Sequence, residues 1–208
     1  MTLSQALLDQ LWEFDDRVAS ESRLRAAVEA ETDAATRAEL ETQVARALGL
    51  QERFVEADAV LSTTPVVSPA VAVRVALERG RLRNSAGDPD AARPLFQLAA
   101  DVAASSHLTF LQVDALHMLA IADPEHAPEW TARAIEVLDP TTDPRTRRWL
   151  VSLHNNAGWS HLDAGRPHDA LVEFEKAQDA AARWGTPQQV VWAEEAVAEA
   201  LAALPPAR

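Results

Sequence analysis

Two histidines seven residues apart are the polar side chains whose spacing is most like that of metal ligands. His154 and His161 fall on one predicted helix, where this separation lets them share a face. Asp163 and His168 follow closely. Zinc, however, needs three or four converging ligands, and no such set is evident. We therefore favour packing between helices, with one ring nitrogen hydrogen-bonded, and expect no metal.

The sequence contains none of the short motifs that mark common catalytic centres. The nucleophile-elbow, zinc-protease, P-loop and dinucleotide-binding patterns are absent, as are cysteine and tyrosine. Adjacent acids such as Glu194 and Glu195 point apart on a helix, so we interpret them as solvated surface. We expect no catalytic residues, no enzymatic activity and no cofactor.

A repeated pattern of small and aromatic residues predicts the secondary structure of the chain. Segment 158–177 holds Gly, Gly, Ala, Phe and Ala at spacings of 7, 5, 4 and 3, and segment 80–99 repeats the same residues and spacings. Small residues let two helices cross closely. Gly165 suits the left-handed conformation in which helices often end, and Pro167 suits the first turn of the next helix. Each period therefore predicts a helix-turn-helix unit.

The pattern resembles the tetratricopeptide repeat, a helix-turn-helix unit of about 34 residues. The resemblance implies an all-α, right-handed α-solenoid, because one helix pair cannot bury its apolar face alone and must stack on neighbours. We expect a single superhelical domain over residues 1–208, built from about five units and a C-terminal capping helix. The expected units are about 2–30, 33–64, 70–105, 109–139 and 143–184, with the cap at 187–204.

Small residues set the register of these units. In the second helices they are separated by 38, 35, 35 and 43 residues, so two of the four spacings lie near the family period. We expect the first helix of the chain to run from Thr2 to Phe14. The small positions are Ala45, Gly80, Ala115 and Gly158 in the first helices, and Ala19, Ala57, Ala92, Ala127 and Ala170 in the second helices.

The resemblance also implies that the first helix of each unit lines a concave groove. Residues that flank the small positions would then face a bound protein or peptide. Carried over to this chain, these residues are Gln43, Arg46, Glu78, Arg81, Gln112, Leu116, Asn155, Asn156 and Trp159.

Two of these residues are arginines at equivalent places in adjacent units. Arg46 and Arg81 each follow a small position by one residue, and together they could bind a carboxylate or an acidic peptide. Asn155 and Asn156 would hydrogen-bond a peptide backbone, and Trp159 would stack on a side chain. An alternative stays open: Arg46 pairs with a glutamate across units, and Trp159 packs against the capping helix.

The net charge of −13 at pH 7 narrows the class of partner. Nucleic acids and anionic membranes attract basic patches, so we expect neither as a partner. No apolar run approaches the roughly 18 residues of a membrane span, and the start lacks the basic region of a secretory signal. We expect a cytoplasmic protein whose charge serves solubility.

By resemblance, the expected function is non-catalytic recognition of an unknown protein or peptide. Two other classes stay open. The chain could self-associate, for example as a homodimer, through helix 187–204 or its N-terminal helix. It could also be a regulatory sensor of a peptide or small molecule, although such proteins usually carry an effector or DNA-binding module and no basic helix-turn-helix segment is visible.

Overall fold

The computed structural model describes residues 3–13 and 15–205, and the protein is all-helical, as expected. Within these residues there is no strand, and the chain folds into twelve α-helices and one 3₁₀ turn. It divides after Glu125 into two compact units. The α-helices are α1 (Gln5–Leu11), α2 (Arg17–Ala30), α3 (Ala34–Leu50), α4 (Phe54–Thr63), α5 (Pro69–Ser85), α6 (Pro89–Ser105), α7 (Thr109–Ala122), α8 (Ala127–Leu138), α9 (Pro144–Arg147), α10 (Trp149–Asp163), α11 (Pro167–Trp184) and α12 (Pro187–Ala202), and the 3₁₀ turn is Pro124–His126.

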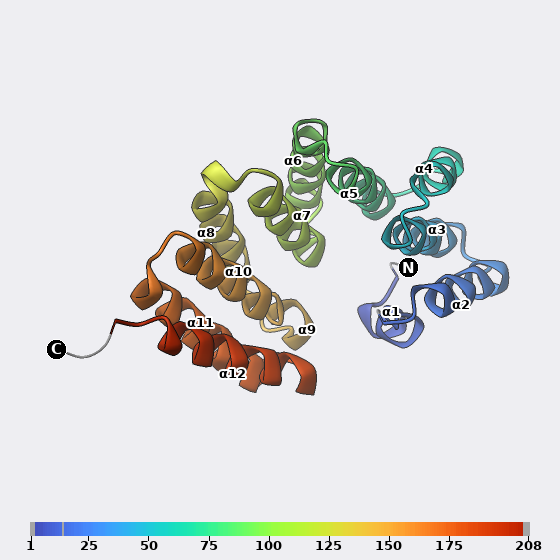
Figure 1. The fold of residues 1–208 in the computed structure, drawn as a ribbon. Helices are drawn as coiled ribbons and strands as arrows, with labels where there is room; N and C mark the ends of the chain where they lie inside the picture. Colours follow the sequence, from blue (N-terminus) through green and yellow to red (C-terminus); the bar gives the residue numbers. More distant parts are fainter. Residues whose placement is uncertain (1–2, 14, 206–208) are drawn as a thin grey trace. The chain divides into compact units, whose positions relative to one another are not determined.

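In the first unit, α3, α5 and α7 pack one against the next. α4 lies against α3 and α5, and α6 lies against α5 and α7 (Figure 1). Leucine and valine side chains fill the space between α2, α3 and α5, where Leu24, Leu40, Leu48 and Val71 are fully buried. The burial of these apolar side chains holds the successive helix pairs together.

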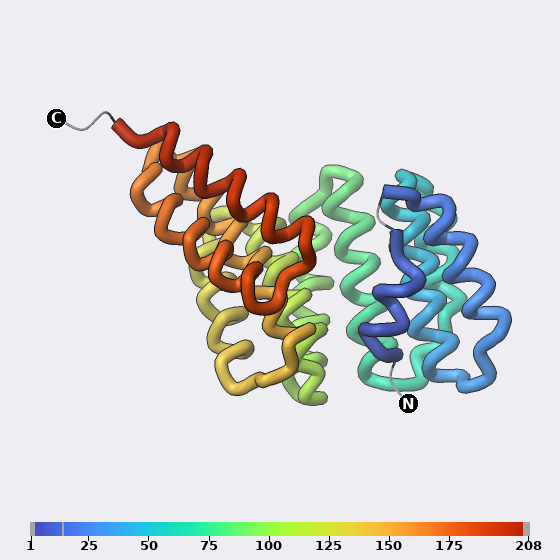
Figure 2. Tube along the Cα trace, turned by 90° about the horizontal axis from the view of Figure 1, so that it is seen from below, coloured from blue at the N-terminus to red at the C-terminus, as the bar shows by residue number. Residues whose placement is uncertain are grey.

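In the second unit, α10 packs against α8 and α11, and α12 lies along α11 and also contacts α10 (Figure 2). α12 corresponds to the expected capping helix, and Thr186 caps its N-terminus by accepting a hydrogen bond from the backbone N–H of Gln189. The other side of α12 exposes Val191, Trp192 and Leu201, so self-association through this helix stays a prediction.

Gly80 and Gly158 lie where a helix packs against the next one with no space for a side chain. A Cβ atom added to Gly80 would lie 2.4 Å from a ring carbon of Phe96, and one added to Gly158 would lie 2.4 Å from a ring carbon of Phe174. Both phenylalanines are 0% exposed. The same contact therefore recurs in each unit, and no larger residue fits at either glycine without displacing a buried ring.

The other small positions fall into two groups. Ala127 is the first residue of α8, where it is half-buried, and Ala19 is also half-buried. The surroundings of Ala127 therefore differ from those of the buried alanines. The small residues that are completely buried are Ala45, Ala57, Ala92, Ala115 and Ala170.

Two turns between helices follow the predicted pattern. Gly87 and Gly165 have φ angles of +83° and +70°, in the left-handed region that favours glycine. The amide of the residue after each glycine donates back to a helix carbonyl, from Asp88 to Arg83 and from Arg166 to His161. These turns reverse the chain within a few residues and so place each second helix against its first.

The structure differs from two of the expected boundaries, those of the first helix and of the predicted unit 109–139. The first helix is shorter than predicted, since α1 covers Gln5–Leu11, and Thr2 and Phe14 lie outside the described residues. The boundary after Glu125 falls inside the predicted unit 109–139, which puts α7 and α8 in different compact units. The single domain over residues 1–208 stays a prediction.

None of the described helices is long and apolar enough to span a membrane.

Candidate functional site

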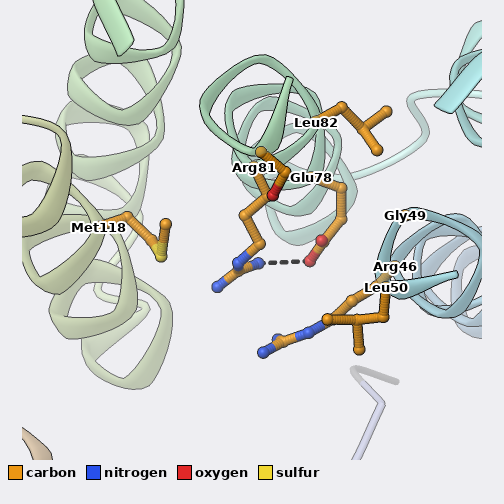
Figure 3. A pocket seen from close by; sticks show the side chains of 8 residues that line it. Arg46, Gly49, Leu50, Glu78, Arg81, Leu82 and Met118 are labelled. Carbon is orange, nitrogen blue, oxygen red and sulfur yellow. Dashed lines mark hydrogen bonds and ion pairs between the residues drawn. The ribbon is translucent and has the colours of Figure 1, made fainter. Parts of the chain in front are cut away.

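A pocket of about 200 Å³ opens between α3, α5 and α7 in the first unit (Figure 3). It combines two guanidinium groups with an apolar wall, and it contains both of the arginines that the repeat predicted at equivalent places. The lining residues are Arg46, Gly49 and Leu50 from α3, Glu78, Arg81, Leu82 and Ser85 from α5, and Met118 from α7.

Arg81 is held between two carboxylates. Its Nη1 donates to Glu78 Oε1 and its Nη2 donates to Asp114 Oδ1 of α7, each at 2.5 Å. All three side chains are largely buried. Burial alone would raise the pKa of Asp114, but the charges of Arg81 and Arg46 outweigh it and leave that pKa below its usual value. The ion pair between successive repeats that stayed open for Arg46 is thus formed by Arg81 instead, with Asp114.

Arg46 differs, because it makes no hydrogen bond or ion pair to any residue that the structure describes. Its Nε is buried without an acceptor, and its guanidinium carbon lies 5.9 Å from the centroid of the Trp12 ring. Figure 3 shows its side chain directed toward the same space as that of Arg81. Burial and the charge of Arg81 lower the pKa of Arg46, against the attraction of Glu78 and Asp114. Arg46 is thus the cation in the pocket that has donors to spare.

The N-terminal segment covers the part of α3 that precedes Arg46. The indole Nε1 of Trp12 donates to Gln43 Oε1 at 3.2 Å, and the backbone amide of Leu3 donates to Glu39 Oε1 at 3.1 Å. Glu39 also forms a buried ion pair with Arg74 of α5 at 2.9 Å. Gln43, predicted to face a groove, is therefore already bound by the chain itself.

The other predicted groove residues of the first unit are mostly closed to a ligand. Gln43, Glu78 and Leu116 are each at most 3% exposed, and only Gln112 is half-buried. The first unit therefore presents a compact pocket at Arg46 instead of a continuous row of open polar side chains.

The three predicted groove residues of α10 belong to the second unit. Trp159 packs edge-on against Phe174, with ring centroids 5.1 Å apart, beside Ala196 and Ala200 of α12. This arrangement matches the alternative in which the tryptophan packs against the capping helix. Asn155 and Asn156 are half-buried. A single groove that joins these residues to Arg46 stays a prediction.

Of the two histidines of α10, His154 contacts α11 through Glu173. His154 Nδ1 lies 2.7 Å from Glu173 Oε2, and Lys176 Nζ lies 2.6 Å from the other oxygen of that carboxylate. Burial would raise the pKa of Glu173, but the hydrogen bonds from Lys176 and His154 lower it. His161 has a buried Nδ1 without a hydrogen-bond partner. Within residues 3–13 and 15–205, no three metal-binding side chains gather at one point.

The shifted pKa of His117 on α7 should make the stability of the protein depend on pH. Burial lowers the pKa of this histidine from 6.5 to about 4, although Asp114 opposes the shift. Below pH 6.5 the unfolded chain binds a proton that the folded chain does not, so stability is lost as the pH falls from about 6.5 to about 4. We expect this residue to contribute a loss on the order of 3 kcal/mol, measured by urea denaturation across that range.

The matched variants for this prediction are His117→Gln and His168→Gln. The first removes the titrating group and should flatten the pH dependence of the unfolding free energy between pH 4 and 6.5. The second changes an exposed histidine in the other unit and should leave the dependence unchanged. An identical slope in His117→Gln and the wild type would contradict the assignment.

Sequence reasoning missed two of the acids that bind the arginines, Glu39 and Asp114. Glu39 and Arg74 are 35 residues apart, which is also the spacing of Ala57 and Ala92. The two residues therefore occupy equivalent places in adjacent predicted repeats. A search for opposite charges one period apart would have found this pair. Asp114 lies 33 residues after Arg81, which is two residues out of register, so such a search would not have found it.

Comparisons with known proteins bear on the fold. No protein-family model matches the chain, and no curated protein does. Among solved structures, BtubC (BKLC) from P. vanneervenii is similar, with a TM-score of 0.65 and 15% sequence identity over 94% of this chain and 84% of that chain. At this identity the likeness concerns the helical fold alone.

Proposed function

We propose that this protein is a non-catalytic binding module that recognises a protein or peptide partner through α3, α5 and α7. Arg46 carries the proposal, because it is a cation with unused donors that faces a pocket. Leaving a buried donor without an acceptor costs about 1–3 kcal/mol. A partner that supplies an acceptor oxygen would recover this free energy on binding.

The ion pairs around the pocket support this function, because they fix its walls before a partner arrives. Arg81 is held from both α5 and α7, and Arg74 joins α5 to α3 through Glu39. A site whose side chains are already ordered loses less conformational entropy on binding. The three helices can therefore present Arg46 in one fixed place.

The architecture that we propose is a tetratricopeptide-like solenoid in the cytoplasm. Its support is the repeated contact of a small residue with a buried phenylalanine, in α5 with α6 and again in α10 with α11. Left-handed glycines at equivalent turns add to this support. In such arrays the first helices form the surface that binds partners.

Capture of partners from a lysate of the source organism tests the proposal. Arg46→Ala should leave the helical circular dichroism spectrum unchanged, because the side chain has no ion pair to lose, and should reduce the specifically captured partner by about tenfold or more. The measurement is quantitative mass spectrometry of the captured proteins.

Arg79→Ala is the matched control. This arginine is on α5, in the same compact unit as Arg46, but its side chain is 38% exposed and faces Asp58 of α4. It should capture partners as the wild type does. If Arg46→Ala and the wild type capture the same proteins in the same amounts, the proposal that α3, α5 and α7 bind a partner is wrong.

A further inference from the structure

We infer that the pocket at Arg46 binds a carboxylate attached to one compact apolar group. The inference rests on the proposed function and names the chemistry of its site. It comes from the guanidinium of Arg46, the apolar side chains around it and the size of the pocket.

The charges around the pocket direct a carboxylate to Arg46. Glu78 and Asp114 are both satisfied by Arg81, so the two acids have their cation already. Arg46 has no such partner among the described residues, and its pKa is lowered because the attraction of Glu78 and Asp114 offsets only part of the effect of its burial. A planar carboxylate matches the donors of a guanidinium and forms two parallel hydrogen bonds with it.

The remaining wall of the pocket is mostly apolar, and Ser85 is its uncharged polar side chain. Leu50 from α3, Leu82 from α5 and Met118 from α7 surround the guanidinium groups, and Met118 faces them across the pocket in Figure 3. A methionine side chain adapts to irregular apolar groups. The pocket thus offers one cation without an ion pair, Arg46, beside a surface that favours a hydrocarbon group.

The size of the pocket limits the ligand to one such group. Its volume of about 200 Å³ is below the roughly 300–1,000 Å³ of pockets for drug-sized ligands, and a cavity of about 150 Å³ can hold benzene. Gln43, also on α3, is buried and already accepts from Trp12, so its amide is not available to an extended peptide. The ligand is therefore a free small acid or the last residue of a protein chain.

Isothermal titration of the 208-residue chain with matched pairs of ligands tests this chemistry. The first pair is 4-methylpentanoate and its neutral amide. The second pair is a short peptide that ends in leucine, with a free or an amidated carboxyl terminus. Each ligand is titrated into the wild type, Arg46→Met and the control Arg79→Met, after circular dichroism has verified that each variant is folded.

The free carboxylate should bind the wild type at least about tenfold more tightly than the amide, since a hydrogen bond to a charged group contributes about 1.5–3 kcal/mol. Arg46→Met should lose this preference, and Arg79→Met should keep it. Tighter binding of the peptide acid than of the free acid assigns the pocket to a chain terminus, and the reverse order assigns it to a free acid.

Equal binding of acid and amide, or no binding of either acid at millimolar concentration, overturns the inference. The capture experiment separates this failure from that of the proposed function. If capture depends on Arg46 while no acid binds, the inference of a carboxylate ligand is wrong, and the proposal that α3, α5 and α7 bind a partner is kept. If the acids bind through Arg46 while capture does not depend on it, the carboxylate site stands and the proposed protein partner is wrong.

Discussion

Replacing Arg81 by alanine is expected to lower the free energy of unfolding by about 3–5 kcal/mol, whereas replacing Arg46 is expected to lower it by about 1 kcal/mol or less. The two arginines occupy equivalent sequence positions, but Arg81 is the cation for two buried carboxylates. Its removal leaves Glu78 and Asp114 charged and unpaired in the interior. Urea denaturation of the two variants at pH 7 measures the difference.

A neutral version of the same network is the control. Arg81→Met combined with Glu78→Gln and Asp114→Asn removes the charges together, so it should recover most of the stability that Arg81→Met alone loses. Similar losses for Arg81→Ala and Arg46→Ala would contradict the assignment of the ion pairs to Arg81.

The pH dependence of this difference follows from Asp114. Its pKa in the folded protein lies below the usual value, so the stability it contributes is present above about pH 4 and is lost as the pH falls through the folded pKa. In Arg81→Ala that contribution is absent. The stabilities of the variant and the wild type should therefore converge as the pH falls below about 4.

Phe174→Ala should lower the free energy of unfolding by about 3–5 kcal/mol, which is the other large effect that the structure predicts. Phe174 is completely buried against Gly158 and Trp159, where little can move into the space left by its ring. Phe96→Ala should cost a similar amount in the first unit, because Phe96 is equally buried against Gly80.

Val172→Ala is the control on the same helix. This valine is 50% exposed, so its replacement should change stability by about 0.5 kcal/mol or less. Chemical denaturation followed by circular dichroism measures all three variants. A loss below about 1 kcal/mol for Phe174→Ala would mean that the contact of glycine with phenylalanine does not hold the helix pair together.

The local elements of this fold could be predicted because their signals lie within a few residues of each other. Gly165 and its equivalent Gly87 marked helix ends, and Pro167 marked the start of the helix that follows Gly165. The sequence did not mark the boundary after Glu125. The spacing of Ala92 and Ala127 suggested an unbroken period there, but Ala127 begins α8 in the second unit.

By itself, the sequence determined that the protein is helical and that glycine and phenylalanine recur at fixed spacings, because helix propensity and periodicity act within a single element. Only the tertiary structure decided that Arg81 is paired while Arg46 is not, and that Trp12 covers Gln43. These outcomes depend on which side chains from different helices come within about 3 Å of each other. Two arginines at equivalent repeat positions therefore differ because their neighbours on other helices differ.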